Sequence, residues 1–394
     1  MSADFPRHES SGLCTRIKRL ERWKVMKTLF WVCLLLTFYA YAGYPAWLFV
    51  EKTFRPRPIR RASLQPSVSI VMAVFNGGAY LAGKLKNLRD LHYPSELLQV
   101  ILVSDGSTDE TAELLQQNVP FVEPIILPRS RGKAAALNVA VKQAKGDILF
   151  FMDVRQRIER NALVELVSCF ADEDVGAVSG ELIIEQGTNT ETGGVGLYWQ
   201  IEKMTRKLES DSGSVIGVTG AIYAIRRQLY QNLPEGTILD DVLVPMSVAR
   251  AGRRVVFLPT AVAYDQIFQE KGREFSRKVR TLTGNYQLVQ ENAWLLSLEN
   301  PLLFRLVSHK LLRLPVPGLL ILMLIASGIS PGEFYHVCFG LQVGFYALAL
   351  MGALFPVANK AKPIGAANAF VMLNAAAALA FYNFVRGRRV GWTS

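Results

Sequence analysis

The sequence of 394 residues is poor in charge and in cysteine. Only 20% of its residues are charged, whereas 50% are hydrophobic, which is apolar for a soluble enzyme of this length. The four cysteines, Cys14, Cys33, Cys169 and Cys338, lie far apart, which excludes a framework of closely spaced disulfides and a zinc site with paired ligands. Internal repeats and low-complexity tracts are also absent, so the sequence does not indicate a repeat architecture. A reduced cytosol fits the cysteine pattern.

The hydrophobic excess is concentrated in uncharged segments. Residues 28–50, 335–357 and 364–385 are each long enough to cross a bilayer core of about 30 Å. A shorter run, 314–330, predicts either a fourth crossing or a re-entrant segment. The first segment is too long for a signal-peptide core, and no small-residue cleavage pattern follows it, so we interpret it as a retained anchor. The sequence therefore predicts an integral, multi-pass membrane protein.

The formal net charge of +11 does not indicate nucleic-acid binding, because much of it flanks the apolar segments. Basic residues cluster before residue 28 and in the linker 52–61, where they bind anionic headgroups and favour the cytosolic side. The loop 359–362 agrees with this orientation, whereas the basic tail 386–389 agrees only if 314–330 is re-entrant. We expect a lipid bilayer and no nucleic acid as partner, in a bacterial inner membrane with the central domain in the cytosol.

Between residues 65 and 300 the composition changes to that of an α/β domain. Short β-branched runs alternate with amphipathic helical stretches, which indicates a mostly parallel sheet with flanking helices. Segment 301–313 has apolar residues at near-helical spacing with cations opposite, which predicts a helix on the membrane surface. The expected order is a basic segment (1–27), a transmembrane helix (28–50), the α/β domain (65–300), an interfacial amphipathic helix (301–313), a membrane region of two or three crossings (314–385) and a basic tail (386–394).

Two aspartates stand directly after apolar runs of this domain. Asp105 ends "LQVILVSD" and Asp153 ends "GDILFFMD". Because ligands bind outside the carboxyl ends of strands in open α/β sheets, both are candidates for a ligand site. Each aspartate alone is also explained by capping of the following turn or helix. Lys133, in a Gly-Lys pair that opens the alanine-rich helix between them, makes the combination more specific.

Four stretches carry a resemblance to a known family: "MAVFNGG", "LVSDGSTDET", "GKAAALN" and "TILDDVLV". With them, the region from about 67 to 285 resembles a family 2 glycosyltransferase with a GT-A fold, of the membrane-embedded kind that includes cellulose, hyaluronan and chitin synthases. Gly77 stands where the first motif of the family has an acid. The resemblance implies that the donor nucleotide is bound by Phe75, Asn76, Asp105, Lys133 and Asp153.

The resemblance also implies an inverting transfer from a nucleotide sugar, which needs a general base for the acceptor hydroxyl and positive charge for the departing diphosphate. It places Asp241 as the base and Asp240 beside it at the acceptor, with helix capping as the alternative for this pair. It places Thr219 and Gly220 beside the acceptor sugar, because a residue without a side chain permits close approach. A packed core strand is the alternative for that segment.

The sequence departs from the family pattern where the family has a metal-binding D-x-D pair. It offers Asp153-Val154-Arg155 instead. Asp153, together with substrate phosphate oxygens and water, would still hold Mg²⁺ or Mn²⁺. Alternatively, Arg155 would neutralise the diphosphate directly, since a guanidinium forms paired hydrogen bonds to phosphate. The sequence leaves both alternatives open.

A second departure lies at "RKVRT", residues 277–281, where processive synthases have Q-x-x-R-W. Arg280, with Lys278 and Arg277, is expected to bind the diphosphate, and a solvated basic face is the alternative. Thr281 stands in place of the tryptophan on which a terminal sugar rests, and Tyr286 substitutes for that ring only if the backbone turns it towards the acceptor.

The leading hypothesis is a glycosyltransferase that extends an exopolysaccharide or capsular glycan at the cytosolic membrane face, with UDP-sugar as the expected donor and export or synthase subunits as candidate partners. One alternative is transfer of a single sugar to a lipid or lipid-linked acceptor. Another, of a different class, is a catalytically silent membrane partner of a synthase, which the missing carboxylate permits.

Overall fold

The computed structural model describes residues 9–117, 119–185, 193–266 and 273–388. The chain divides into two compact units. The sheet unit comprises residues 45–190, 199–310 and 379–394, and the helical unit comprises residues 1–44, 191–198 and 311–378. The strands of the sheet unit are β1 (Val68–Val74), β2 (Leu98–Asp105), β3 (Glu123–Leu127), β4 (Ile148–Met152), β5 (Arg157–Ile158), β6 (Val175–Glu185), β7 (Ile222–Arg226) and β8 (Arg254–Gln266).

The strands form one mixed sheet in the order β3-β2-β1-β4-β7-β6-β8-β5. Strands β1, β2, β3 and β4 pair in parallel, as do β6 and β8. Strand β7 runs antiparallel to both of its neighbours, β4 and β6, and β5 runs antiparallel to β8. The predicted α/β class with a mostly parallel sheet is therefore confirmed. The carboxyl ends of β2 and β4 lie at one edge, with β1 between them.

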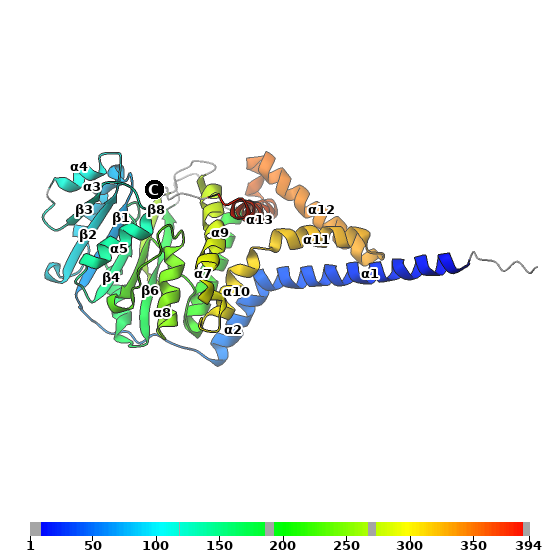
Figure 1. Ribbon diagram of the computed structural model, residues 1–394, viewed down its shortest axis with the longest axis horizontal. Helices are drawn as coiled ribbons and strands as arrows, with labels where there is room; N and C mark the ends of the chain where they lie inside the picture. Colours follow the sequence, from blue (N-terminus) through cyan, green and yellow to red (C-terminus); the bar gives the residue numbers. More distant parts are fainter. Residues whose placement is uncertain (1–8, 118, 186–192, 267–272, 389–394) are drawn as a thin grey trace, which may run out of the picture. The chain divides into compact units, whose positions relative to one another are not determined.

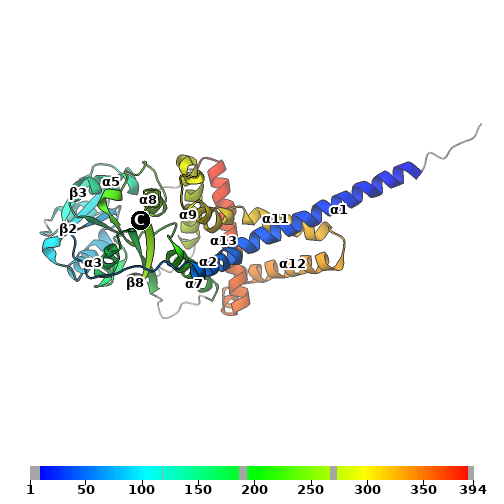
Figure 2. The same cartoon turned by 90° about the horizontal axis from the view of Figure 1, so that it is seen from below.

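Helices cover both faces of this sheet (Figure 1). The helices of the sheet unit, to which most of α7 belongs, are α3 (Gly78–Arg89), α4 (Thr111–Gln116), α5 (Lys133–Gln143), α6 (Ala162–Ser168), α7 (Gly193–Ser212), α8 (Asp240–Arg250), α9 (Arg273–Glu291) and α10 (Leu303–His309). Alternate residues of β1, among them Ile70 and Met72, pack with Leu81 of α3 and Leu163 of α6 in one apolar core. Figure 2 shows α5 and α8 on the other side of the sheet from α3.

Helix α5 lies where the alanine-rich stretch predicts it. Its alanines are buried, so their small side chains allow the helix to pack closely on β1 and β2. Gly132, with φ of 91°, precedes the first residue of the helix, Lys133. This backbone conformation favours glycine and sets the start of α5 at the lysine.

The helical unit contains α1 (Glu9–Phe38), the π-helical turn Tyr39–Gly43, α11 (Val316–Ile329), α12 (Glu333–Leu354) and most of α13 (Lys362–Val385). Phe30 and Cys33 of α1 pack against Met323 and Ala326 of α11. Among the described residues, Lys18–Phe54, Glu333–Leu354 and Lys362–Val385 are long and apolar enough to cross a membrane. Val316–Ile329 passes this test only together with the preceding Leu303–Arg313, from which it is bent by 58°, so a fourth crossing and a re-entrant segment both stay open.

Candidate functional site

Lys133 joins acidic side chains from separate parts of the chain. Its Nζ lies 3.1 Å from Oδ1 of Asp153, which directly follows β4, and 3.3 Å from Oδ2 of Asp240, the first residue of α8. Burial alone lowers the pKa of Lys133, but the carboxylates of Asp153, Asp240 and Asp241 outweigh it and raise that pKa above its ordinary value. The lysine is therefore charged at neutral pH. Three residues that the sequence predicts for one site do lie together.

Asp241 is held in place through its backbone. Pro245, four residues on in α8, has no N–H to donate, so the Asp241 carbonyl is left without its helical hydrogen bond. The N–H of Val218 donates to that carbonyl instead, at 2.8 Å. The first turn of α8 is thereby joined to the segment 217–220, which precedes β7. A Cβ built on Gly220 would lie 3.9 Å from Oδ2 of Asp241 and 3.7 Å from Nζ of Lys133, so this glycine borders both.

The pKa of the Asp241 carboxyl group is shifted towards neutral pH. Burial and the neighbouring Asp240 raise its pKa from 3.8 to about 6, against the opposing effect of the cations Lys310 and Lys133. A base is most effective when its pKa lies near the working pH. Asp241 is thus ionised at pH 7 and still able to accept a proton. The sequence does not predict that Lys310, just after α10, acts on Asp241, because the two residues are far apart in the chain and share no local motif.

Asp105 positions a loop. The residue is fully buried, and its carboxylate accepts hydrogen bonds from the Ser130 hydroxyl at 2.8 Å and from the backbone N–H groups of Arg131 at 2.9 Å and Gly132 at 2.8 Å. These contacts fix the loop that leads into α5 and Lys133. Contact of Asp105 with a nucleotide base stays a prediction.

The turn after β1 is built around Asn76, which adopts a positive φ of 52°. Its Oδ1 accepts a hydrogen bond from the Thr108 N–H at 2.8 Å, which joins this turn to the one after β2. A Cβ on Gly77 would lie only 2.6 Å from Val74 Cγ1 and 3.1 Å from Val154 Cγ1. The acid of the family motif therefore has no room here. Phe75 is half-buried beside this turn, and its contact with a donor stays a prediction.

Arg155 is engaged with a partner that the sequence did not indicate. It forms a paired interaction with Asp265 of β8, from Nε to Oδ1 at 3.0 Å and from the second guanidinium nitrogen to Oδ2 at 2.5 Å. Gln156 Nε2 also donates to Asp265, at 3.0 Å. Asp265 is 8% exposed at its side chain, so this pair is largely desolvated. This pairing uses Nε and one terminal nitrogen of the guanidinium, and contact of Arg155 with the diphosphate stays a prediction.

The protein itself offers few ligands for a divalent cation at this strand end. No cluster of three histidine, cysteine or acidic side chains able to hold a metal occurs among the described residues. Asp153 is the one acid left from the D-x-D pattern, and it already pairs with Lys133. Beneath the same loop, the buried Lys84 donates to the carbonyl of Gln156. Burial lowers the pKa of Lys84 to about 7, although the negative charge of Asp153 acts to raise it. The predicted Mg²⁺ or Mn²⁺ at Asp153 would therefore enter a site that already holds cations.

Thr219 is fixed by an arginine that the sequence gave no reason to select. Arg206 of α7 donates to the Thr219 hydroxyl at 2.8 Å and to the Ser179 hydroxyl at 2.7 Å. Its guanidinium also lies 4.6 Å from the ring centroid of Phe257. The Thr219 side chain therefore has a structural partner, whereas neighbouring Gly220 faces Asp241 and Lys133.

Helix α9 carries the predicted basic residues. Gly284 packs it on the segment before Asp240, because a Cβ there would lie 2.8 Å from Leu239 Cγ. Arg280, one turn earlier, has a buried Nε without a hydrogen-bond partner among the described residues. Arg277 is exposed, and Lys278 lies 4.5 Å from the ring centroid of Trp199. Their binding to a diphosphate stays a prediction.

Tyr286 of α9 does not supply the ring that Thr281 lacks. Its ring stacks on Phe384, with 5.0 Å between centroids, and also contacts Phe381. Both partners belong to the last turns of α13, within the sheet unit. The tyrosine is therefore used in packing.

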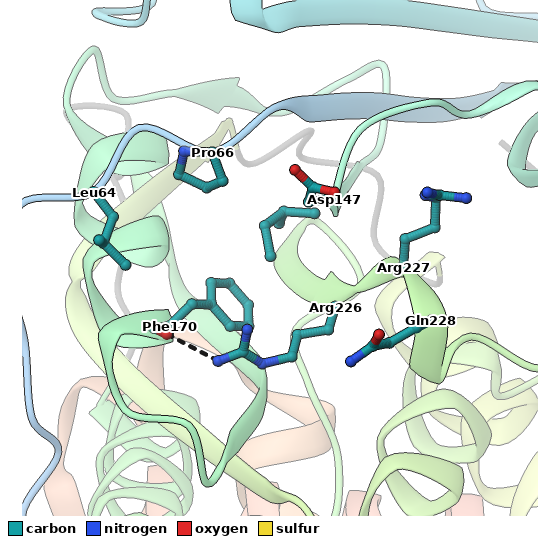
Figure 3. A pocket seen from close by; sticks show the side chains of 8 residues that line it. Leu64, Pro66, Asp147, Phe170, Arg226, Arg227 and Gln228 are labelled. Atoms are coloured by element: carbon teal, nitrogen blue, oxygen red, sulfur yellow. Dashed lines mark hydrogen bonds between the residues drawn. The ribbon is translucent and has the colours of Figure 1, made fainter.

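A cavity of about 290 Å³ lies elsewhere in the sheet unit, lined by Leu64, Pro66, Asp147, Ile148, Phe170, Arg226, Arg227 and Gln228 (Figure 3). It adjoins the first residue of β4, whereas Asp153 follows the last residue of that strand. The Arg226 guanidinium donates to the carbonyls of Phe170 and Val175 at 2.8 and 2.9 Å, so it serves the fold. None of the predicted site residues lines this cavity.

Comparisons with known proteins agree with the geometry. A family model, Glycosyl transferase family 2, matches residues 69–233. The probable glycosyltransferase YdaM of Bacillus subtilis (strain 168) is 24% identical over 278 residues, covering 66% of this chain and 65% of that protein. The poly-beta-1,6-N-acetyl-D-glucosamine synthase of Staphylococcus aureus (strain COL) is 24% identical over 234 residues, covering 56% of this chain and 55% of that protein. The chain thus spans less than two thirds of the length of either relative.

A solved structure supports the fold. The mannosyltransferase PcManGT from Pyrobaculum calidifontis, in complex with GDP-Man and Mn²⁺, is similar with a TM-score of 0.70 and 21% identity. The match covers 91% of this chain and 99% of that chain.

Proposed function

We propose that the chain is an inverting glycosyltransferase that uses a nucleotide sugar, from the premise that residues 69–233 match the glycosyl transferase family 2 model. The observation that carries the proposal is the cluster of Lys133, Asp153 and Asp240 beside Asp241. It combines a charged ammonium for a leaving phosphate with a carboxylate able to take a proton near pH 7.

In the proposed reaction, an acceptor hydroxyl oxygen forms a bond to the anomeric carbon of the donor sugar. The bond from that carbon to the β-phosphate oxygen breaks on the opposite face, and its electron pair leaves with the nucleoside diphosphate. Asp241 takes the hydroxyl proton, and Lys133 compensates the negative charge that develops on the phosphate. Gly220 leaves space for the acceptor beside Asp241, because a side chain there would face both Asp241 and Lys133.

We propose UDP-sugar as the donor and a growing glycan at the cytosolic membrane face as the acceptor, in exopolysaccharide or capsule synthesis. The similar S. aureus protein is named as a synthase of an N-acetylglucosamine polymer, which supports this class of product. The similar archaeal structure contains GDP-Man, so a guanosine donor is the alternative to test. The apolar helices support placement in a membrane as a multi-pass protein, for which we propose the bacterial inner membrane.

Transfer of a single sugar to a lipid or lipid-linked acceptor is the second candidate. Thr281 offers no ring for a terminal sugar, and Tyr286 is packed against Phe384. Within the sheet unit, Phe304 of α10 is 53% exposed and contacts Trp47 of α2 (Tyr44–Phe54), which is 52% exposed. Such an apolar surface next to a catalytic domain suits a lipid-borne acceptor.

The experiment measures nucleoside diphosphate release by the full-length protein in nanodiscs, with a panel of UDP-sugars and GDP-mannose. Wild type is expected to release the diphosphate, and Asp241→Asn to lose about 10²–10⁴-fold in rate while still binding donor. Chromatography of labelled product separates a polymer from one discrete glycolipid. Absence of release with every donor and acceptor would instead favour a silent partner of a synthase.

A further inference from the structure

The strand end that carries Asp153 has lost its second acid without gaining a free cation in its place. Arg155 uses two of its guanidinium nitrogens in bonds to Asp265. Gln156 strengthens that arrangement with a third bond to the same carboxylate. Asp265 is therefore neutralised and does not substitute for the missing carboxylate.

Lys133 already pairs with Asp153, the one acid of this strand end that could hold a metal. Its Nζ is 3.1 Å from Asp153 Oδ1, and its side chain is 15% exposed. A divalent cation needs oxygen ligands within about 2.0–2.6 Å, so one bound to Asp153 would lie within a few ångströms of the ammonium. The two cations would repel each other, although water reaches the Asp153 side chain, which is 38% exposed, and partly screens this repulsion. The buried Lys84, under the same loop, adds a further basic group.

The same ammonium also faces the acceptor side of the site. It lies 3.3 Å from Asp240 Oδ2, and 3.7 Å from the position of a Cβ on Gly220. It therefore stands between the strand end expected to hold the donor and the glycine expected to border the acceptor. A lysine ammonium is a compact charge with three donors on a flexible stem, which suits it to follow the charge on a departing phosphate.

We infer that this enzyme binds and releases the nucleoside diphosphate without a divalent cation, with Lys133 in the role that the metal has in D-x-D enzymes. This inference rests on the proposed function, because it concerns the leaving group of that reaction. The electron pair of the broken bond goes to the β-phosphate oxygen, which Lys133 pairs directly. Asp153 and Asp240 hold the lysine in place before the donor arrives.

The test measures binding of UDP and of GDP by calorimetry to the full-length protein in nanodiscs, with excess EDTA and, in parallel, with Mn²⁺. One of the two nucleotides is expected to bind with the same Kd, within about threefold, in both conditions, a difference below about 0.7 kcal/mol. Lys133→Met should weaken binding by about tenfold or more, and Lys133→Arg should retain most of it. Lys142→Met, which changes an exposed lysine in the last turn of the same helix, should bind as wild type does.

Each other outcome has a defined meaning. Binding that requires Mn²⁺ overturns the inference and leaves the proposed function standing. Unchanged binding by Lys133→Met overturns the role of the lysine, provided that its thermal midpoint matches wild type. Absence of binding by either nucleotide in both conditions overturns the inference together with the proposed donor class.

Electron paramagnetic resonance of Mn²⁺ provides a readout that needs no nucleotide. An equimolar amount of wild-type protein is expected to leave the signal of free Mn²⁺ undiminished. A loss of signal that Asp153→Asn restores would show a metal at this strand end and overturn the inference.

Discussion

The raised pKa of Asp241 predicts that Asp241→Asn stabilises the protein while it removes activity. The carboxyl pKa rises from 3.8 to about 6 on folding, first through burial and then through the nearby Asp240. A pKa shift of about 2 units corresponds to about 3 kcal/mol. Ionisation of Asp241 therefore lowers the free energy of unfolding of wild type by about this amount. An asparagine of the same shape carries no charge and avoids this penalty. Its thermal midpoint should exceed that of wild type by roughly 5–10 °C at pH 8.

The pH dependence of this difference follows from the sign of the shift. Because the folded state holds the proton more tightly than the unfolded state, wild-type stability falls as pH rises from about 4 to about 6 and is then constant. The advantage of Asp241→Asn should therefore be absent near pH 4, grow through this interval and be complete above pH 6. Turnover of wild type should fall about tenfold per unit below pH 6, since only the ionised base is active.

The assay compares thermal midpoints by intrinsic fluorescence at pH 4.5, 6 and 8, with nucleoside diphosphate release at pH 8. Asp90→Asn, which changes an exposed acid at the end of α3, is the matched control and should alter neither quantity. A variant that is no more stable than wild type at pH 8 would refute the raised pKa. A variant that turns over within about tenfold of wild type would refute the role as base.

Three further predictions concern neighbouring residues. Arg155→Leu should destabilise the protein by about 3 kcal/mol, measured as a lower thermal midpoint, because it leaves the buried carboxylate of Asp265 unpaired. A smaller loss of stability in the double variant Arg155→Leu with Asp265→Leu would confirm this cause. Gly220→Ala should fold normally, since the added Cβ makes ordinary contacts, but it should raise the acceptor KM about tenfold or more and leave donor binding unchanged. Gly106→Ala should not fold, because Gly106 has a φ of 63° and an added Cβ would lie 2.2 Å from Ser130 N. The cation of Lys310 lowers the pKa of Asp241, so Lys310→Met should move the acid limb of the pH–rate profile to higher pH by about one unit at most. Lys310→Arg keeps the cation and should leave that limb in place.

The sequence could predict the strand-end acids and the class of sheet, because apolar runs that end in polar residues are local patterns. It could not predict the partner of Arg155, because Asp265 lies 110 residues away and near the end of another strand. The role of Arg206 could not be predicted for a related reason, since its hydrogen bonds to Ser179 and Thr219 depend on the packing of α7. Pro245 frees the Asp241 carbonyl for Val218, a contact that depends on how the segment before β7 packs on α8.

The departures from the family pattern are physically connected, which argues against gradual decay of a dead site. The side chain that Gly77 lacks would collide with Val74 at 2.6 Å and would make a tight contact with Val154 at 3.1 Å, so Gly77 packs against both β1 and the altered D-x-D loop. The next residue of that loop, Arg155, is matched by Asp265 in a largely desolvated pair. This pair stabilises the fold, since burying such a charge is unfavourable without a partner. Meanwhile the groups that the reaction needs, Lys133 and Asp241, remain in place with pKa values suited to their roles. These groups support the proposed departure of the diphosphate without a metal, in which Lys133 carries the charge.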